Sequence, residues 1–262
     1  MKIQFLKVAF NFHYLFQNTI ILINLLRIKC LMSNKQKKIE QIVYDSIDEI
    51  SEELKIDVKF YPEVYFIGRE RETFLFIGLP ETYRKDFYEI RKNKTAGFFP
   101  VHNLIITATD NLEHLSEEAG HFIHLNNSKI NILKIETENL IDRYSIKIIG
   151  ESVGYFCSKI VCPERENVYD YKNFRNFIFT SLNKRNLEYK SLDECIIKNN
   201  NLTEDFFVYK NGYGLGEKMF NEYISGNIKR KFITNLMKKS FKEEFSATKE
   251  LLSMLKKFKG CF

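Results

Sequence analysis

Residues 117 to 121 read Glu-Glu-Ala-Gly-His, and three of these side chains can take part in metal chemistry. Residues four apart in a helix face the same way, so Glu117 and His121 can direct a carboxylate and an imidazole at one metal ion. Glu118 lies between them, where a carboxylate can act on an attacking water as general base. The spacing therefore allows a metal site on one face of a helix, with Glu118 close to it.

The segment from Leu112 to Leu125 keeps a helical period without proline, and Asp110 followed by Glu113 has the spacing of a capping box. One side of this helix is apolar and consists of Leu112, Leu115, Ala119, Phe122 and Ile123. The other side is polar and consists of His114, Glu117, Glu118, His121 and His124. A polar side that simply faces water is the competing interpretation. Gly120 costs about 1 kcal/mol relative to alanine inside a helix, which predicts that a strand or a substrate approaches closely there.

A further carboxylate lies thirty residues on. Glu151 belongs to the segment 146–161, which carries no other charge except two flanking lysines, so this helix is predicted to be buried. An unpaired buried carboxylate costs several kcal/mol. Gly150 and Gly154 stand four residues apart and leave a flat strip that another helix could approach. Glu151 is therefore either a metal ligand, the partner of a lysine, or a residue at a partly exposed helix start.

Taken together, these residues resemble the gluzincin-type zinc metallopeptidases, which combine His-Glu-x-x-His on one helix with a glutamate on a later helix. The resemblance covers roughly residues 36 to 162, and the chain departs from the family at Glu117, which replaces the first histidine. It implies metal-dependent peptide hydrolysis, with the metal held by Glu117, His121 and Glu151 and with Glu118 as the catalytic residue that activates water. The metal would be zinc, while two carboxylates favour manganese or iron(II) more than the usual ligand set does.

Four more side chains are predicted on the substrate side of the metal or behind its ligands: His114, His124, Tyr155 and Tyr213. About 10 Å of helix rise separates His114 from His121, so the two are not expected to share one ion. Tyr155 or Tyr213 could polarise the scissile carbonyl. Histidine in place of Glu117 would restore the standard pair and is expected to tighten zinc binding.

The elements that must position these residues predict an α+β fold. An amphipathic helix over residues 39–54 precedes three strand-like runs: Val58 to Ile67, Thr73 to Leu79 and Asn103 to Thr109. Helix, small mixed sheet, metal-motif helix and glutamate helix is the order of a zincin-like domain, here residues 32–162. Residues 163–262 are predicted to form a C-terminal helical subdomain with a basic end.

Two other interpretations use the same residues. A catalytically inactive zincin scaffold, or pseudoenzyme, would bind no metal and would hold a peptide or protein along an edge strand near Asn103 to Thr109. Helix-bundle di-iron proteins also use the Glu-x-x-His spacing of Glu118 and His121. They need a second such pair, which the sequence lacks.

Composition and charge limit the remaining classes. Five scattered cysteines without a Cys-x-x-Cys pair predict reduced thiols and a cytoplasmic protein. Residues 1–31 contain no apolar run near the roughly 20 residues of a spanning helix, so no transmembrane segment is predicted. The residues Met32-Ser-Asn-Lys-Gln-Lys-Lys are typical of the start of a soluble protein, so translation is predicted to begin at Met32, with 1–31 a misassigned start or a loose arm. Weak association of this arm with a membrane surface is the alternative. The last fifty residues are basic, but a net charge of +6 is modest, so a solvated face is predicted and a nucleic-acid partner is not.

Overall fold

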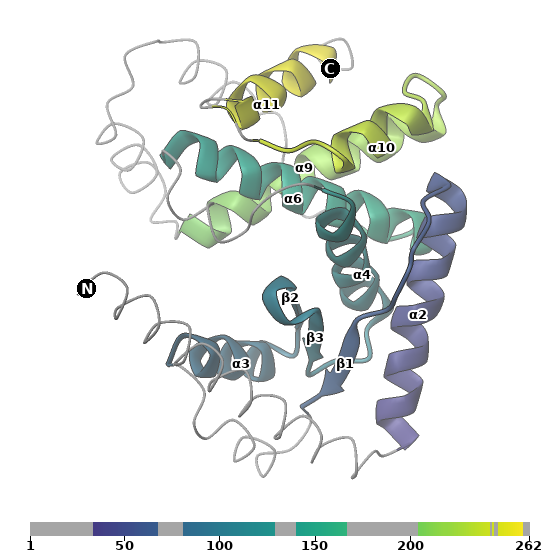
Figure 1. Cartoon of the computed structure of the whole chain (residues 1–262), viewed down its shortest axis with the longest axis vertical. Helices are drawn as coiled ribbons and strands as arrows, with labels where there is room; N and C mark the ends of the chain where they lie inside the picture. The colour runs from purple at the N-terminus through teal and green to yellow at the C-terminus, as the bar shows by residue number, and fades with distance from the viewer. Residues whose placement is uncertain are drawn as a thin grey trace, which may run out of the picture.

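The computed structural model describes residues 34–67, 81–128, 140–166, 204–241, 243 and 246–258. In these residues a small sheet lies beside a set of packed helices, which confirms the predicted α+β class (Figure 1). The helical elements are α2 (Asn34–Leu54), α3 (Glu81–Asn93), η2 (Pro100–His102), α4 (Leu112–Asn127), α6 (Leu140–Val161), α9 (Glu204–Ile224), α10 (Arg230–Met237) and α11 (Ser246–Lys257). Residues 1–31 lie outside the described part, so the prediction for them stays a prediction.

The sheet contains β1 (Glu63–Phe66), β2 (Ala96–Phe99) and β3 (Leu104–Thr107) in the order β1-β3-β2. Strand β3 pairs parallel with β1 and antiparallel with β2, and all four of its side chains are buried, as expected for a central strand. The prediction that the segment Asn103 to Thr109 forms an edge strand is therefore wrong. Strand β2, which packs against α4, lies at one end of the described sheet.

The sequence located the other strands only in part. The predicted strand from Val58 to Ile67 is regular only over β1, and the predicted strand from Thr73 to Leu79 lies outside the described residues. Strand β2 and helix α3 were not expected. Both omissions from the prediction have a physical reason. Strand β2 is only four residues long, and the dense charge of α3 is equally typical of a surface loop.

One hydrophobic core connects most of the helices. Helix α2 buries a stripe with helical spacing, in agreement with the predicted amphipathic helix: Ile39, Val43, Ile47, Ile50 and Leu54. The same core contains Leu115 of α4, Phe156 of α6, Leu215 of α9 and Leu251 of α11, all fully buried. The described helices of the predicted C-terminal subdomain thus pack into the same core as the predicted zincin-like domain.

Helix α4 begins at Leu112 as predicted, but its capping residue is Asn111, one residue later than the predicted Asp110. The side chain of Asn111 accepts hydrogen bonds from the backbone N–H groups of Glu113, at 2.7 Å, and His114, at 3.4 Å. Asp110, the predicted capping residue, instead forms an exposed ion pair with Lys35 at 3.5 Å. Asn111 therefore fixes the first turn of the helix that carries the candidate site.

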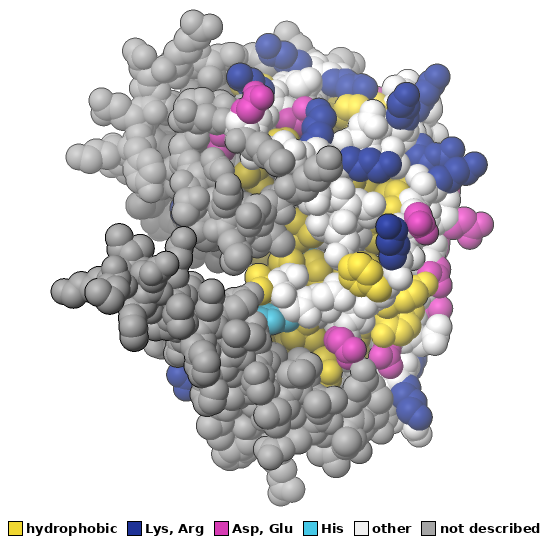
Figure 2. Space-filling model, in the orientation of Figure 1, with side chains coloured by type: hydrophobic (Ala, Val, Ile, Leu, Met, Phe, Trp, Pro, Cys, Tyr) yellow, Lys and Arg dark blue, Asp and Glu magenta, His cyan; other side chains and the backbone are white. Residues whose placement is uncertain are grey.

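Lys and Arg side chains gather over α10 and α11 at the top of the view in Figure 2. The lysines of this region are exposed, whereas Ile233, Leu236 and Leu255 of the same helices are buried in the core. This arrangement agrees with a solvated basic face. None of the helices in the described residues is both long and apolar enough to cross a membrane.

Candidate metal centre

The site is built where α4 crosses α6, and two glycines make the crossing close. A Cβ on Gly120 would lie 2.5 Å from the Cβ of Cys157, and a Cβ on Gly154 would lie 2.6 Å from Nε2 of His121. The close approach predicted at Gly120 is confirmed, although a helix rather than a strand makes it. At Gly150 a Cβ would meet nothing within 4 Å in the part of the chain that the structure describes, so there Gly154 alone of the two glycines around Glu151 serves the contact.

Helix α9 closes the other side of α6 in the same way. A Cβ on Gly212 would overlap the side chain of Glu151, and a Cβ on Gly216 would lie 2.6 Å from the backbone oxygen of Ser152. The backbone of α9 therefore lies directly against the residue that carries the later carboxylate. This contact places Tyr213, the neighbour of Gly212, beside the candidate site.

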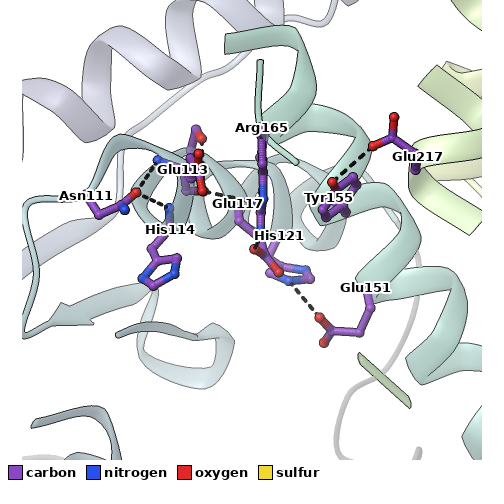
Figure 3. Close-up of polar contacts among 11 residues, drawn as sticks. Asn111, Glu113, His114, Glu117, His121, Glu151, Tyr155, Arg165 and Glu217 are labelled. Carbon is purple, nitrogen blue, oxygen red and sulfur yellow. Dashed lines mark hydrogen bonds and ion pairs between the residues drawn. The ribbon is translucent and has the colours of Figure 1, made fainter. Parts of the chain in front are cut away.

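Glu117, His121 and Glu151 converge. Each offers one ligand atom, and these atoms all lie within 4.8 Å of one another. His121 Nε2 and Glu151 Oε2 are 3.6 Å apart, and Figure 3 shows the Glu151 carboxylate pointing at the His121 ring. Glu117 is 4% exposed, so the polar side of α4 does not simply face water there. Among the described residues Glu151 pairs with the histidine and not with a lysine, as a ligand set requires.

The donor set fits a divalent metal. Ligand atoms around a tetrahedral zinc are about 3.4 Å apart, since each lies about 2.0 to 2.2 Å from the ion. Since the candidate ligand atoms lie up to 4.8 Å apart, their spacing would have to close by about 1.4 Å at most, which side-chain rotations can supply. Oε2 of Glu151 is buried, and its partner among the described residues is His121 Nε2, which at 3.6 Å is too far for a normal hydrogen bond. An ion held between the two side chains would give this buried oxygen a closer partner.

Arg165 is the residue that sequence reasoning missed. It lies 6% exposed in the turn after α6, and its Nη2 donates to Oε2 of Glu117 at 2.7 Å. Its Nη1 also donates to Ser158 Oγ and to the backbone oxygen of Glu113. Burial opposes the positive charge of Arg165, but the Glu117 carboxylate together with Tyr213 and Tyr155 outweighs burial and raises the pKa of the guanidinium. The first of the three candidate ligands is therefore already paired with a buried cation.

A second buried cation holds the turn that carries Arg165. Lys159 Nζ donates to the backbone oxygens of Pro163, at 2.6 Å, and Arg165, at 2.7 Å. Its charge is balanced by Glu217 of α9, whose Oε2 lies 3.6 Å away and also accepts from the Tyr155 hydroxyl at 3.0 Å. The contacts of this network join α6, α9 and the turn after α6, so the position of the Arg165 guanidinium is built into the fold.

Glu118 faces strand β2. Its Oε2 accepts a hydrogen bond from the backbone N–H of Phe98 at 2.7 Å, which orients the carboxyl group. Burial raises the pKa of Glu118 to about 7, although the charge of His121 opposes this shift. A carboxyl group with a pKa near neutrality can take up and release a proton at physiological pH, which is what a general base needs.

His121 is charged at neutral pH in the absence of a metal. Burial alone would lower its pKa, but the neighbouring carboxylates, Glu151 foremost, outweigh burial and raise the pKa of His121 to about 10. The proton on His121 then balances Glu151. A metal ion that bound the same nitrogen would displace that proton, because only the neutral imidazole has a free lone pair.

The four residues predicted around the metal occupy different positions. His114 is partly buried and lies apart from the triad in Figure 3, which agrees with its exclusion as a ligand. Tyr155 donates its hydroxyl to Glu217, so that hydroxyl is not aimed at a substrate. The Tyr213 ring packs on Arg165, 5.1 Å from the guanidinium, and burial followed by Glu117 raises its pKa well above the ordinary value. His124 lies in the core, 1% exposed.

His124 predicts a pH dependence of stability. Both of its ring nitrogens are buried without a hydrogen-bond partner in the described residues, and burial lowers its pKa to about 3. As the pH falls, His124 takes up a proton in the unfolded chain before it does so in the folded protein. The free energy of unfolding therefore falls as the pH drops below about 6.5. At pH 5 the loss should reach about 2 kcal/mol, since each pKa unit is about 1.4 kcal/mol.

The variant His124→Leu should remove that loss. Urea unfolding at pH 7 and pH 5 measures it in both proteins, as the difference between the two free energies of unfolding. We expect the variant to show about 2 kcal/mol less acid destabilisation than the parent. An identical pH dependence in both proteins would show that His124 does not titrate differently on folding.

Comparisons with protein-family models, with curated proteins and with solved structures found no match for this chain. The likeness to gluzincins therefore stays a prediction from the sequence, and the geometry of the site is the basis for inferring a function.

Proposed function

We propose that the chain is a divalent-metal-dependent hydrolase of peptides, with Glu117, His121 and Glu151 as the metal ligands. The observation that carries the proposal is the convergence of these three side chains around the buried Oε2 of Glu151, whose partner in the described residues, His121 Nε2, lies 3.6 Å away. A carboxylate–imidazole–carboxylate set suits zinc, manganese or iron(II). A cation held there would supply Lewis acidity toward water and a substrate carbonyl.

In this proposal Glu118 is the general base. One of its carboxylate oxygens is held by the N–H of Phe98, which leaves the other for the attacking water. Its pKa of about 7 lets it accept the proton of that water and return it to the leaving amine. Strand β2 stands next to Glu118 at one end of the described sheet, so a peptide could lie along β2 with its scissile bond near the triad.

A second candidate is the inactive scaffold, and one observation favours it. The Arg165 guanidinium already neutralises Glu117, and protonated His121 already neutralises Glu151. Such a site is balanced without a metal, and the chain would then bind a peptide or protein partner along β2 without cleaving it. Whether the chain binds a metal distinguishes the hydrolase from the inactive scaffold.

The test is metal binding by the purified chain. Calorimetric titration with zinc and with manganese at pH 8 should give one bound ion per chain. His121→Gln and Glu151→Gln should each weaken binding about tenfold or more, because each removes one ligand. His114→Gln is the matched control, since His114 lies on the same helix outside the triad, and its affinity should equal that of the parent.

Two results would remove the proposal. The first is a parent protein that binds neither metal, which would leave the scaffold as the better candidate. The second is equal weakening by His114→Gln and His121→Gln, which would show that binding occurs elsewhere on α4.

A further inference from the structure

The charge at position 117 is the feature that separates this site from one with two histidines. A divalent ion held by two neutral imidazoles and one carboxylate leaves a net charge of +1. With Glu117 in place of the first imidazole the sum falls to zero. Arg165, 2.7 Å from Glu117, returns it to +1.

We infer that Glu117 and Arg165 act together as one neutral ligand unit that replaces the missing histidine electrostatically. This inference rests on the proposed metal site. The Glu117 carboxylate has two oxygens, so one can stay with the guanidinium while the other turns to the ion. The Tyr213 side chain also hydrogen-bonds this carboxylate and helps to hold it. Ligating carboxylates are commonly held by hydrogen bonds of this kind, which fix their orientation. Arg165 is thus a positioning residue, acting on the metal through Glu117.

The surroundings of Arg165 are those of a permanent cation. An arginine keeps its charge at every physiological pH. A buried arginine needs acceptors for its N–H donors and groups that stack on the planar face of its guanidinium. Here the guanidinium lies 4.4 Å from the ring centroid of Tyr155 and 5.1 Å from that of Tyr213. Lys159 fixes the backbone oxygen of the same residue at 2.7 Å. These contacts hold the charge beside Glu117 rather than leaving it free to reach solvent.

The pairing of Glu117 with Arg165 changes the expected effect of Glu117→His on zinc binding. From the sequence alone, Glu117→His is expected to tighten zinc binding. In the structure the same change leaves Arg165 buried without its carboxylate partner. The net charge of the site rises by one, and the unpaired guanidinium repels the metal ion. The restored pair should bind zinc well only when the guanidinium is removed as well.

A double-mutant cycle tests this with Glu117→His, Arg165→Met and the combined variant. Zinc affinity is measured by competition with a chromophoric chelator at pH 8. The combined variant should bind zinc at least about tenfold more tightly than Glu117→His, because two close positive charges repel strongly at low dielectric. Arg165→Met alone leaves Glu117 without its cation, so saturating zinc should raise its Tm by more than it raises the Tm of the parent. Arg165→Lys keeps the charge and should restore the response of the parent.

Each outcome decides one claim. Equal zinc affinities of Glu117→His and the combined variant, with zinc bound by the parent, would overturn the ligand unit and leave the proposed metal site intact. Failure of the parent to bind zinc would remove the proposed function, and the ligand unit with it. Should Glu117→His not fold, the larger zinc-induced rise in Tm for Arg165→Met, with its reversal in Arg165→Lys, supports the inference, and equal rises in all three proteins overturn it.

Discussion

Glu118→Gln is expected to lower metal-dependent peptide hydrolysis about a hundredfold or more and to make the metal-free protein more stable above pH 7. Glutamine keeps the shape of the side chain and can still accept the N–H of Phe98, so the fold should not change. It cannot accept a proton from water. Zinc affinity should stay within a few fold of the parent, since Glu118 is not among the three converging ligands.

The gain in stability follows from the pKa of Glu118, which burial raises from 4.5 to about 7. The folded protein keeps this proton when the unfolded chain has lost it, so the carboxyl group costs stability progressively as the pH rises from 4.5 through 7. The shift corresponds to about 3 kcal/mol, and solvent screening of a partly exposed group reduces this to about 2 kcal/mol. A residue that destabilises the fold at working pH is typical of functional sites.

Urea unfolding at pH 5 and pH 8 in the presence of a chelator measures this gain. The variant should exceed the parent by about 2 kcal/mol at pH 8 and by much less at pH 5. Glu52→Gln is a suitable control, because Glu52 is an exposed carboxylate on α2. Retained peptide hydrolysis in Glu118→Gln would rule out its role as the base, and equal stabilities at pH 8 would rule out the raised pKa.

The local sequence pattern was sufficient to predict the two helices that carry Glu117, His121 and Glu151. Helical period predicted α4 and α6, and the isolation of Glu151 in an apolar segment predicted that it needs a partner. Position 151 lies thirty residues from position 121, and its role as a ligand beside His121 was implied by the family resemblance, while the chemistry of a buried carboxylate left a lysine partner or an exposed helix start open. The cost of Gly120 in a helix likewise predicted a close approach that the structure contains.

The residues that sequence reasoning missed depend on tertiary contacts. Arg165 follows the end of α6 by four residues, in a turn with no periodicity, and only the packing of that turn brings it to Glu117. The order of the sheet could not be predicted either, because a short apolar run fits a central strand and an edge strand equally well. For this reason the segment Asn103 to Thr109 was predicted as an edge strand, whereas β2 lies at one end of the described sheet.

Gly154→Ala and Gly150→Ala are expected to have opposite effects, although both make the same change on the same helix. A Cβ at position 154 would lie 2.6 Å from Nε2 and from Cε1 of His121, so the imidazole must move away from Glu151. Zinc affinity should fall about tenfold or more because the ligand geometry is lost. The free energy of unfolding should fall by about 1–3 kcal/mol, as overpacking in a close helix contact usually costs.

Gly150→Ala is the matched control, because a Cβ there would meet nothing within 4 Å. Alanine is favoured over glycine inside a helix, so this variant should gain up to about 1 kcal/mol and bind zinc as the parent does. Urea unfolding and zinc titration of the two variants measure both effects. Should the variants behave alike, the close contact of Gly154 with His121 would not exist in solution, and the convergence of His121 with Glu151 would lose its structural basis.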